Sequence, residues 1–296
     1  MTVDIAKVKA TATRAFADTF ANINPAWRSA VRVYTDDAPT LELGAYIGAG
    51  AYGAAAGAAA TAEDIDSVKS VISATHKDQL YTVDWDDIRD SLSLVENISR
   101  ILANEADKTL YDIVEAGILA LPSTAHPLQN DRGVGAAIKF ADTGINYGGP
   151  LAGTTQDNLL TMSFSRNAVK AAIKMLREYR NQSGLQLNLG QQVNLLVGPE
   201  NEDEAFAIAN SAMSSDQMQS SVLPQRVAGV AVMPGLGNDW AVVDAEANPL
   251  VLHLRGLPEI VVREKDTGLA VNFSGKLSAT FGLMPSEAGL IYSQVA

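Results

Sequence analysis

The sequence contains no cysteine among its 296 residues. This absence excludes disulfides, thiolate metal sites, iron–sulfur clusters and cysteine nucleophiles together, and it removes any need for an oxidising compartment. Basic residues are also scarce, because 22 Lys and Arg stand against 34 Asp and Glu, which gives a formal net charge of −12. This charge has the wrong sign for general binding to a phosphate backbone. Nucleic acid is therefore not expected as a direct ligand.

Long apolar runs are also missing. The longest uncharged stretch, LGAYIGAGAYGAAAGAAATA at 43–62, has the length of a membrane span but draws its apolar character mainly from alanine. Its five glycines would each weaken a helix by about 1 kcal/mol relative to alanine, so we expect no membrane helix here. At the N-terminus, Asp4 interrupts the apolar run that a secretory signal needs.

The composition is that of a globular protein with a full core. Hydrophobic residues make up 47% and charged residues 19% of a 31.2 kDa chain. A chain of this mass can bury about three quarters of its unfolded surface. Residues 1–38 are predicted to form an amphipathic arm or a short helix. The Gly/Ala stretch that follows is too poor in large side chains to form a core, so it is predicted to be a projecting loop or arm that needs a partner.

The clearest helix is predicted from Ser91 onward. Residues 91–115 contain no Gly or Pro, and apolar side chains recur at helical spacing, while Gly117 and Pro122 mark the end. Before this helix, an acidic helix start near Thr61 is expected to lead into a strand at 79–85 and then a turn.

The second half of the chain changes pattern. Ser165 is predicted to cap a helix, and Asn201 to cap another that ends near Met213. Strands are predicted at Val193–Val197, Val227–Met233, Trp240–Asp244, Leu250–Leu254, Glu259–Glu264 and Leu269–Leu283. The last two form a hairpin with a long second arm. Helices and strands do not alternate regularly enough for a doubly wound sheet, so the fold class is α+β.

Two glycine-containing motifs resemble nucleotide-binding loops, but the sequence around them lacks the features that such loops require. Gly48-Ala-Gly-Ala-Tyr-Gly53 spells GxGxxG, but a glycine-broken alanine run follows it and no second parallel strand ends in an acid at the required spacing. Around Lys276, the sequence FSGKLS lacks the Ser or Thr that a phosphate loop places directly after Lys. Lys276 is therefore predicted to be a solvated strand residue.

Other candidate catalytic or metal-binding residues also favour structural interpretations. Asp84, Asp86 and Asp87 lack the glycine and distal glutamate of a calcium loop, so Asp86 or Asp87 is predicted to cap a turn or helix. The three histidines His76, His126 and His253 lie apart with no paired spacing. No G-x-S-x-G motif is present. We therefore predict no catalytic, cofactor-binding or metal-binding residue, and a structural or assembly protein that is not an enzyme.

From Asn167 onward the order of features resembles the major capsid proteins of tailed phages. The resemblance rests on the segments SRNAVKAAIKMLREYRNQSG, VNLLVGPENEDEAFAIANSA, VAGVAVMPGLG, DWAVVDAEANPLVLHLRGLPEIVVREKD and LAVNFSGKLSATFGLMPSEAGLIYSQ, and upstream on QLYTVDWDDIRDS. It is similar to the shell-forming fold of the Hong Kong phage, and within it to the Mu-like branch. The resemblance implies a spine helix at Ser91–Leu119.

The resemblance also implies a domain organisation. We expect an N-terminal arm at 1–38, an extended loop at 39–82, a peripheral domain with the spine helix at 83–157, an axial domain at 158–255, and strands that return to the peripheral domain at 256–296. The Gly/Ala stretch falls where the family carries a loop that reaches over a neighbouring subunit. Some relatives crosslink subunits through Lys and Asn. Lys69 and Lys77 lie in or beside the loop, but no pattern identifies an acceptor.

The function implied is that of a virion protein that self-assembles into an icosahedral head shell in the host cytoplasm. The implied partners are copies of the chain in pentamers and hexamers, a scaffolding protein, a portal and a decoration protein, with DNA enclosed but not specifically bound. No cofactor and no membrane partner are implied. Two alternatives stay open: an encapsulin-like nanocompartment shell, and a nucleotide-binding enzyme that uses Gly48–Gly53.

Overall fold

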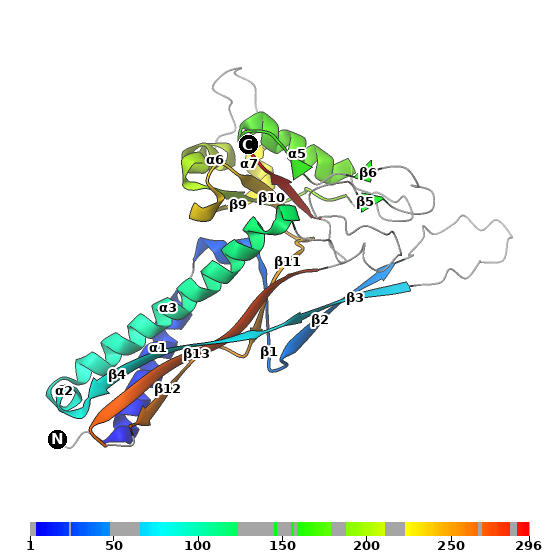
Figure 1. Ribbon diagram of the computed structural model, residues 1–296. Coiled ribbons are helices and arrows are strands. Elements are labelled where there is room, and N and C mark those ends of the chain that lie inside the picture. Colours follow the sequence, from blue (N-terminus) through cyan, green and yellow to red (C-terminus); the bar gives the residue numbers. More distant parts are fainter. Residues whose placement is uncertain are drawn as a thin grey trace.

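The computed structural model describes residues 4–23, 25–47, 66–123, 145–146, 155–156, 159–178, 188–210, 223–265, 268–284 and 289–295. Helices and strands are arranged in two parts (Figure 1). The first module is an elongated sheet with two long helices along it. The second module is a compact sheet with shorter helices, at one end of the first. The glycine-rich motif at Gly48–Gly53 and His126 lie outside the described residues.

One long strand organises the first module. Strand β13 (Ala270–Leu283) pairs antiparallel with β11 (Leu250–Arg255), β12 (Glu259–Glu264) and β4 (Thr75–Asp84). Strand β1 (Arg32–Asp36) adds parallel to β11 at the edge. The predicted hairpin between 259–264 and 269–283 is confirmed, with a second arm of 14 residues. This arm is long enough to pair with β4 along one edge and with β12 and then β11 along the other.

The predicted spine helix is confirmed as α3 (Leu92–Leu119), with Ser91 at the position before its first turn. At 1.5 Å per residue its 28 residues extend about 42 Å along the sheet. Its buried stripe recurs at helical spacing and includes Val95, Leu102, Leu110 and Val114. Gly117 does not end the helix. A Cβ at this position would lie 2.2 Å from a ring carbon of Phe281, so the glycine makes room for that ring.

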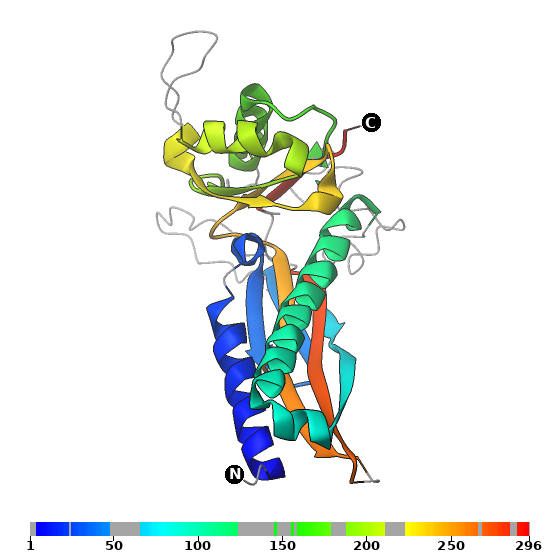
Figure 2. The ribbon, with the colours of Figure 1, turned by 90° about the vertical axis from the view of Figure 1, so that its left-hand side faces the viewer.

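The N-terminal segment packs on its own chain. Helix α1 (Ile5–Asn22) contacts α3 and β12, and it buries Val8, Ala12 and Phe16, which are spaced one turn apart. The Asp4 carboxylate caps it by accepting the Lys7 backbone N–H. Figure 2 shows α1 beside the N-terminal part of α3. The amphipathic helix is thus confirmed. The alternative expectation, an arm separate from the body, is wrong for these residues, because the apolar stripe of the helix packs against α3 and β12 of the same chain.

The second module contains a mixed sheet with the order β7-β14-β10-β8-β9. Its strands are β7 (Leu159–Leu160), β8 (Val193–Val197), β9 (Val227–Val232), β10 (Trp240–Asp244) and β14 (Leu290–Ser293). Helix α5 (Arg166–Glu178) and helix α6 (Glu202–Asn210) share one core cluster with Val193, Leu195 and Val242 of the sheet. Short helices α7 (Leu223–Arg226), η4 (Pro199–Asn201) and η5 (Pro234–Leu236) complete the module. Two further strands, β5 (Ile145–Asn146) and β6 (Thr155–Gln156), form a separate pair.

Helix caps in the second module follow the sequence in part. Ser165 caps α5 as predicted, because its Oγ accepts the Ala168 backbone N–H at 3.1 Å. Asn201 does not cap α6. It lies within η4, and its side-chain amide donates instead to the Asn238 carbonyl oxygen. The predicted end of this helix near Met213 lies outside the described residues.

Two strands belong to different sheets from those expected. β11 belongs to the first module, beside β1 and β13, although it lies within the predicted axial segment 158–255. β14 belongs to the second module, beside β10, although residues 256–296 were predicted to return to the peripheral domain. The chain therefore crosses between the modules twice near its end. A boundary at 255 does not describe this exchange, because pairing partners are not encoded in local sequence.

A two-stranded ribbon leads away from the first module. Strand β2 (Thr40–Ile47) pairs antiparallel with β3 (Asp66–Ser73), and β3 is followed after Ala74 by β4 in the main sheet. Figure 1 shows the ribbon extending from the body. Residues 66–73 are thus a strand. The predicted passage from a helix start directly into a strand at residue 79 is corrected here, since the β-branched residues of this segment favour a strand.

Candidate functional site

The structure places the candidate metal ligands at the start of a short helix. Asp84 occupies the position before α2 (Trp85–Asp90), and Asp86 and Asp87 lie in its first turn. The prediction that Asp86 or Asp87 caps this helix is therefore wrong: the capping position is that of Asp84, whose side chain makes no capping hydrogen bond. Within the described part of the chain, no three His, Cys, Asp or Glu side chains are close enough to hold a metal ion.

The two described histidines have structural partners. His76 is exposed, and its ring nitrogens lie 2.9 Å from the Ser278 hydroxyl and 3.0 Å from the Asp78 carboxylate. His253 is fully buried in β11, and its Nε2 donates to Asp36 at the end of β1, over 3.0 Å. This hydrogen bond lowers the pKa of Asp36, since it favours the charged carboxylate. The interpretation of both as surface or packing residues is confirmed.

The candidate lysines lie on strands. Lys276 is in the middle of β13, in register with Glu259 on one side and Asp78 on the other, as expected for a strand residue. Lys77 is exposed on β4, and Lys69 belongs to β3 of the ribbon. A groove of about 400 Å³ lies between α3 and the strands β4 and β13, with Lys77, Lys276 and Glu105 in its lining. Its charges are of both signs.

A short helix joins the two modules near the N-terminus. Helix η1 (Ala26–Ala30) follows α1 and contacts β1, β8 and β9. The amide of Asn194, from β8 of the second module, donates to the Ser29 carbonyl oxygen at 2.9 Å. The buried amide of Asn248, just before β11, donates to the Ala30 carbonyl oxygen at 2.8 Å. Buried amides with satisfied partners fix the position of this helix relative to both sheets.

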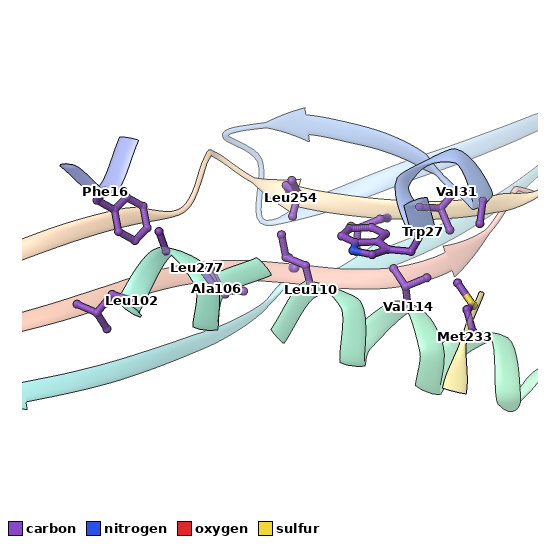
Figure 3. Close-up of a cluster of buried hydrophobic side chains, with 14 of the residues drawn as sticks. Phe16, Trp27, Val31, Leu102, Ala106, Leu110, Val114, Met233, Leu254 and Leu277 are labelled. Carbon is purple, nitrogen blue, oxygen red and sulfur yellow. The ribbon is translucent and has the colours of Figure 1, made fainter. Parts of the chain in front are cut away.

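The spine helix forms a second link between the modules. Near its C-terminus, Glu115 accepts the Gly235 backbone N–H of η5 at 2.7 Å. Below this contact, Trp27, Val31, Val114 and Met233 belong to one buried cluster that also contains Phe16, Leu102, Leu110 and Leu254 (Figure 3). The cluster therefore contains residues from α1, η1, α3, the first sheet and the second module. The main core continues across the junction.

The C-terminal strand is held by one aspartate. Tyr292 of β14 donates from its hydroxyl to Asp239 at 2.9 Å, and the Val295 backbone N–H donates to the other carboxylate oxygen at 2.8 Å. Burial raises the pKa of Tyr292 above its usual value, and the nearby Asp239 charge raises it further. These bonds attach the last strand to the second module.

The remaining features are exposed surfaces. A groove of about 720 Å³ between α1 and α3 is lined by Arg14, Asp18, Glu96 and Arg100, among smaller residues. Large apolar side chains are more than half exposed at Val71 of the ribbon, Leu80 of β4, Leu257 and Leu269. Among the described residues, no helix combines the length and hydropathy required to cross a bilayer. The arrangement provides two firmly joined modules, a projecting ribbon and apolar surface suited to contacts between proteins.

Comparisons with known proteins agree with this architecture. A family model described as phage capsid protein matches residues 68–285. A virus-like particle from Pyrococcus furiosus has a similar structure, with a TM-score of 0.57 and 9% identity over 97% of this chain and 100% of that chain. The capsid of Cyanophage P-SCSP1u gives a TM-score of 0.56 and 9% identity over 92% and 88% of the two chains.

A further cyanophage, A-1(L), has a capsid chain with a TM-score of 0.52 and 13% identity, over 90% of both chains. At such low identities these structures show a shared fold alone. No curated protein matches the chain. The matched segment 68–285 contains the spine helix and most strands of both modules. Sequence reasoning did not identify the residues at the junction, such as Glu115 and Asn194, since nothing local marks a residue that pairs over a long sequence distance.

Proposed function

The chain belongs to the phage capsid protein family, and from this premise we propose that copies of it close into pentamers and hexamers of an icosahedral head shell. It is a structural capsid protein with an α+β fold of the Hong Kong phage type. The observation that carries the proposal is the family match over 68–285, which extends from the ribbon to the end of β13.

The two modules suggest a division of roles in the shell. We assign the first module, with α3 along its long sheet, to the peripheral domain, and the second module to the axial domain at the centre of a ring. A rigid subunit suits this role, because each copy must hold the angle at which rings of five and six close. The contacts of Glu115, Asn194 and Asn248 support such rigidity across the junction.

The ribbon supports a contact with a neighbouring subunit. β2 and β3 lead away from the body, and Val71 on this ribbon is 57% exposed. An extended two-stranded ribbon cannot bury its own side chains, so a partner surface would stabilise it. We assign the ribbon to the extended loop of the family, and a neighbouring copy of the chain to its partner. The expected range 39–82 is too long at its end, because β4 from Thr75 onward pairs with β13 in the main sheet.

Other partners follow from the family. We propose that a scaffolding protein, a portal and a decoration protein join the shell, which assembles in the host cytoplasm and encloses DNA without binding it specifically. The net charge of −12 supports the last point, because an acidic shell repels the packaged genome. The role is structural, and we assign the chain no catalysis. Within the family we place it in the Mu-like branch, because the sequence segments from Asn167 onward resemble those of that branch.

Sedimentation and analysis of the contents test this function. The chain, expressed with its neighbouring phage genes, should sediment as large shells that protect DNA from nuclease. Shells that protect a co-purified enzyme and no DNA would support the nanocompartment alternative. A chain that stays at the sedimentation rate of a monomer in all conditions, with or without the other phage proteins, would overturn the proposal.

A further inference from the structure

Helix α5 carries an exposed basic face in an acidic protein. Its 13 residues include four basic side chains and one acidic one, whereas the whole chain has a net charge of −12. Ala168, Val169, Ala172, Ile173 and Leu176 are buried on the inner side of the helix. Lys170 and Lys174 are exposed on the outer side, one turn apart. Lys174 has only the exposed Glu178 of the same helix as an ion-pair partner among the interactions described, at 3.6 Å.

Helix α6 carries the opposite charge. Glu200, Glu202, Asp203 and Glu204 are all exposed, and residues 199–210 include no basic side chain. The helix dipole favours acids in a first turn. It does not account for Phe206, which is 43% exposed and lies one turn from Glu202 on the same side of the helix. An exposed aromatic ring with polar side chains at its rim is typical of a protein contact surface.

The two helices cover opposite ends of the same sheet. In the order β7-β14-β10-β8-β9, α5 contacts β14 and β10, while α6 contacts β8 and β9. Both helices belong to the core cluster on the face opposite to the first module, and Figure 1 shows both above the second sheet. Beside the α5 end, Met162 follows β7 and is 40% exposed. Helix α5 is thus mainly basic, with Glu178 as its one acid, while the start of α6 is acidic, and each lies near one exposed large apolar side chain.

We propose that the basic face of α5 in one subunit binds the acidic start of α6 in the next subunit of the same ring. This inference rests on the proposed function, because it names the surfaces by which second modules meet around a ring. Two different surfaces on opposite ends of one module make a head-to-tail contact, and such contacts generate rings when the rotation closes. The complementary partner is therefore a second copy of this chain.

Complementary charges act mainly on partner choice and on the rate of encounter. Each exposed ion pair contributes little by itself, so single neutral substitutions are weak tests. Reversing two charges on one side is a strong test, because it places like charges opposite one another across the contact. The two double variants are Lys170→Glu with Lys174→Glu, and Glu202→Lys with Asp203→Lys.

The experiment measures ring and shell formation by native mass spectrometry and electron microscopy, with circular dichroism to verify the fold. Each double variant alone should lower the fraction of chain in rings by about tenfold or more. All four substitutions in one chain should restore rings, because the charges again match. Salt near 1 M should partly rescue each double variant, since the screening length falls to about 3 Å. The control, Lys9→Glu with Lys108→Glu, makes the same charge change on exposed helical sites of the first module and should assemble normally.

Mixing the two double variants gives the sharpest result. A one-to-one mixture can match charges only if the variants alternate around the ring, so it should close even-membered rings and no five-membered ring. Normal assembly of the Lys170→Glu, Lys174→Glu variant would overturn the inference. A variant that assembles normally but no longer binds nucleic acid would overturn it as well, because the basic face would then contact nucleic acid and not a second subunit. Failure of the unmodified chain to form any ring would overturn the proposed function itself.

Discussion

The carboxylate of Glu115 accepts the backbone N–H of Gly235 at 2.7 Å and also accepts the hydroxyl of Tyr111. Glu115 and Tyr111 lie one turn apart on the spine helix, whereas Gly235 belongs to the second module. A Cβ on Gly235 would lie 2.8 Å from the Glu115 carboxyl carbon, so this approach needs glycine. Burial and the hydrogen bond to the charged Glu115 both raise the pKa of Tyr111 above its usual value.

Replacing Glu115 tests the link between the modules. Glu115→Ala should lower the free energy of unfolding by about 1 kcal/mol, because a partly exposed hydrogen bond to a charged group is lost. Glu115→Gln keeps an acceptor oxygen and should cost less. Urea denaturation followed by tryptophan fluorescence measures both, and equal stabilities for the alanine variant and the unmodified protein would contradict the link.

Leu102 is expected to be a main support of the spine helix. Its side chain is 1% exposed and faces β13 at Gly275, so Leu102→Ala should cost about 2–5 kcal/mol. The neighbouring Ile101 is 47% exposed and provides the matched control, for which alanine should cost well under half as much. Denaturant midpoints of the two variants give the comparison. Equal losses at both positions would show that the buried face is misassigned.

At Gly117 we predict a change in stability opposite to the one that helix propensity predicts. Alanine is more favourable than glycine in a helix by about 1 kcal/mol, but a Cβ here would lie 2.2 Å from the Phe281 ring. We therefore expect Gly117→Ala to destabilise the protein, as measured by thermal unfolding. Ala116→Gly, at an exposed position of the same helix, is the control for propensity alone. Stabilisation by Gly117→Ala would mean that the ring does not pack here.

The contact between Asp36 and His253 predicts a pH dependence. The hydrogen bond from His253 lowers the pKa of Asp36 below its ordinary value of 3.8. The stability that this contact adds is therefore fully present above the ordinary pKa and is lost as the pH falls through the lowered value. Asp36→Asn should reduce the loss of thermal stability as the pH falls from 5 to 2, whereas Asp37→Asn, at the exposed neighbour, should not. Identical pH profiles for the Asp36 variant and the unmodified protein would exclude the contact.

Deleting residues 48–60 separates folding from assembly. The segment has few large side chains that could contribute to a core. The subunit should keep its circular dichroism spectrum, while closed shells become rare in electron micrographs. Global unfolding of the deletion variant would contradict the assignment of this segment to contacts between subunits.

Local pattern was sufficient for most elements of the fold. An uninterrupted apolar stripe predicted the start and most of α3 but ended it too early at Gly117, and compact apolar runs predicted β8, β10 and β12 with their observed bounds. Pairing was not predictable in the same way. The parallel contact of Arg32 with Val251 joins segments more than 200 residues apart, and nothing in either segment names the other.

The contact surfaces between the two modules, and between copies of the chain, were even harder to predict from the sequence. Asn194 and Asn248 are ordinary polar residues in the sequence, and their importance arises only when the fold places the Ser29 and Ala30 carbonyl groups beside them. The acids of α6 lie in its first turn, where the helix dipole favours them, and only the fold places the basic face of α5 at the other end of the same sheet.

Cryo-electron microscopy of the assembled product tests the central claim most directly. The account predicts closed icosahedral shells in which α3 lies in the shell wall and second modules meet around each ring axis. A structure in which the purified chain stays a lone globular monomer, without contacts between copies in any condition, would contradict it.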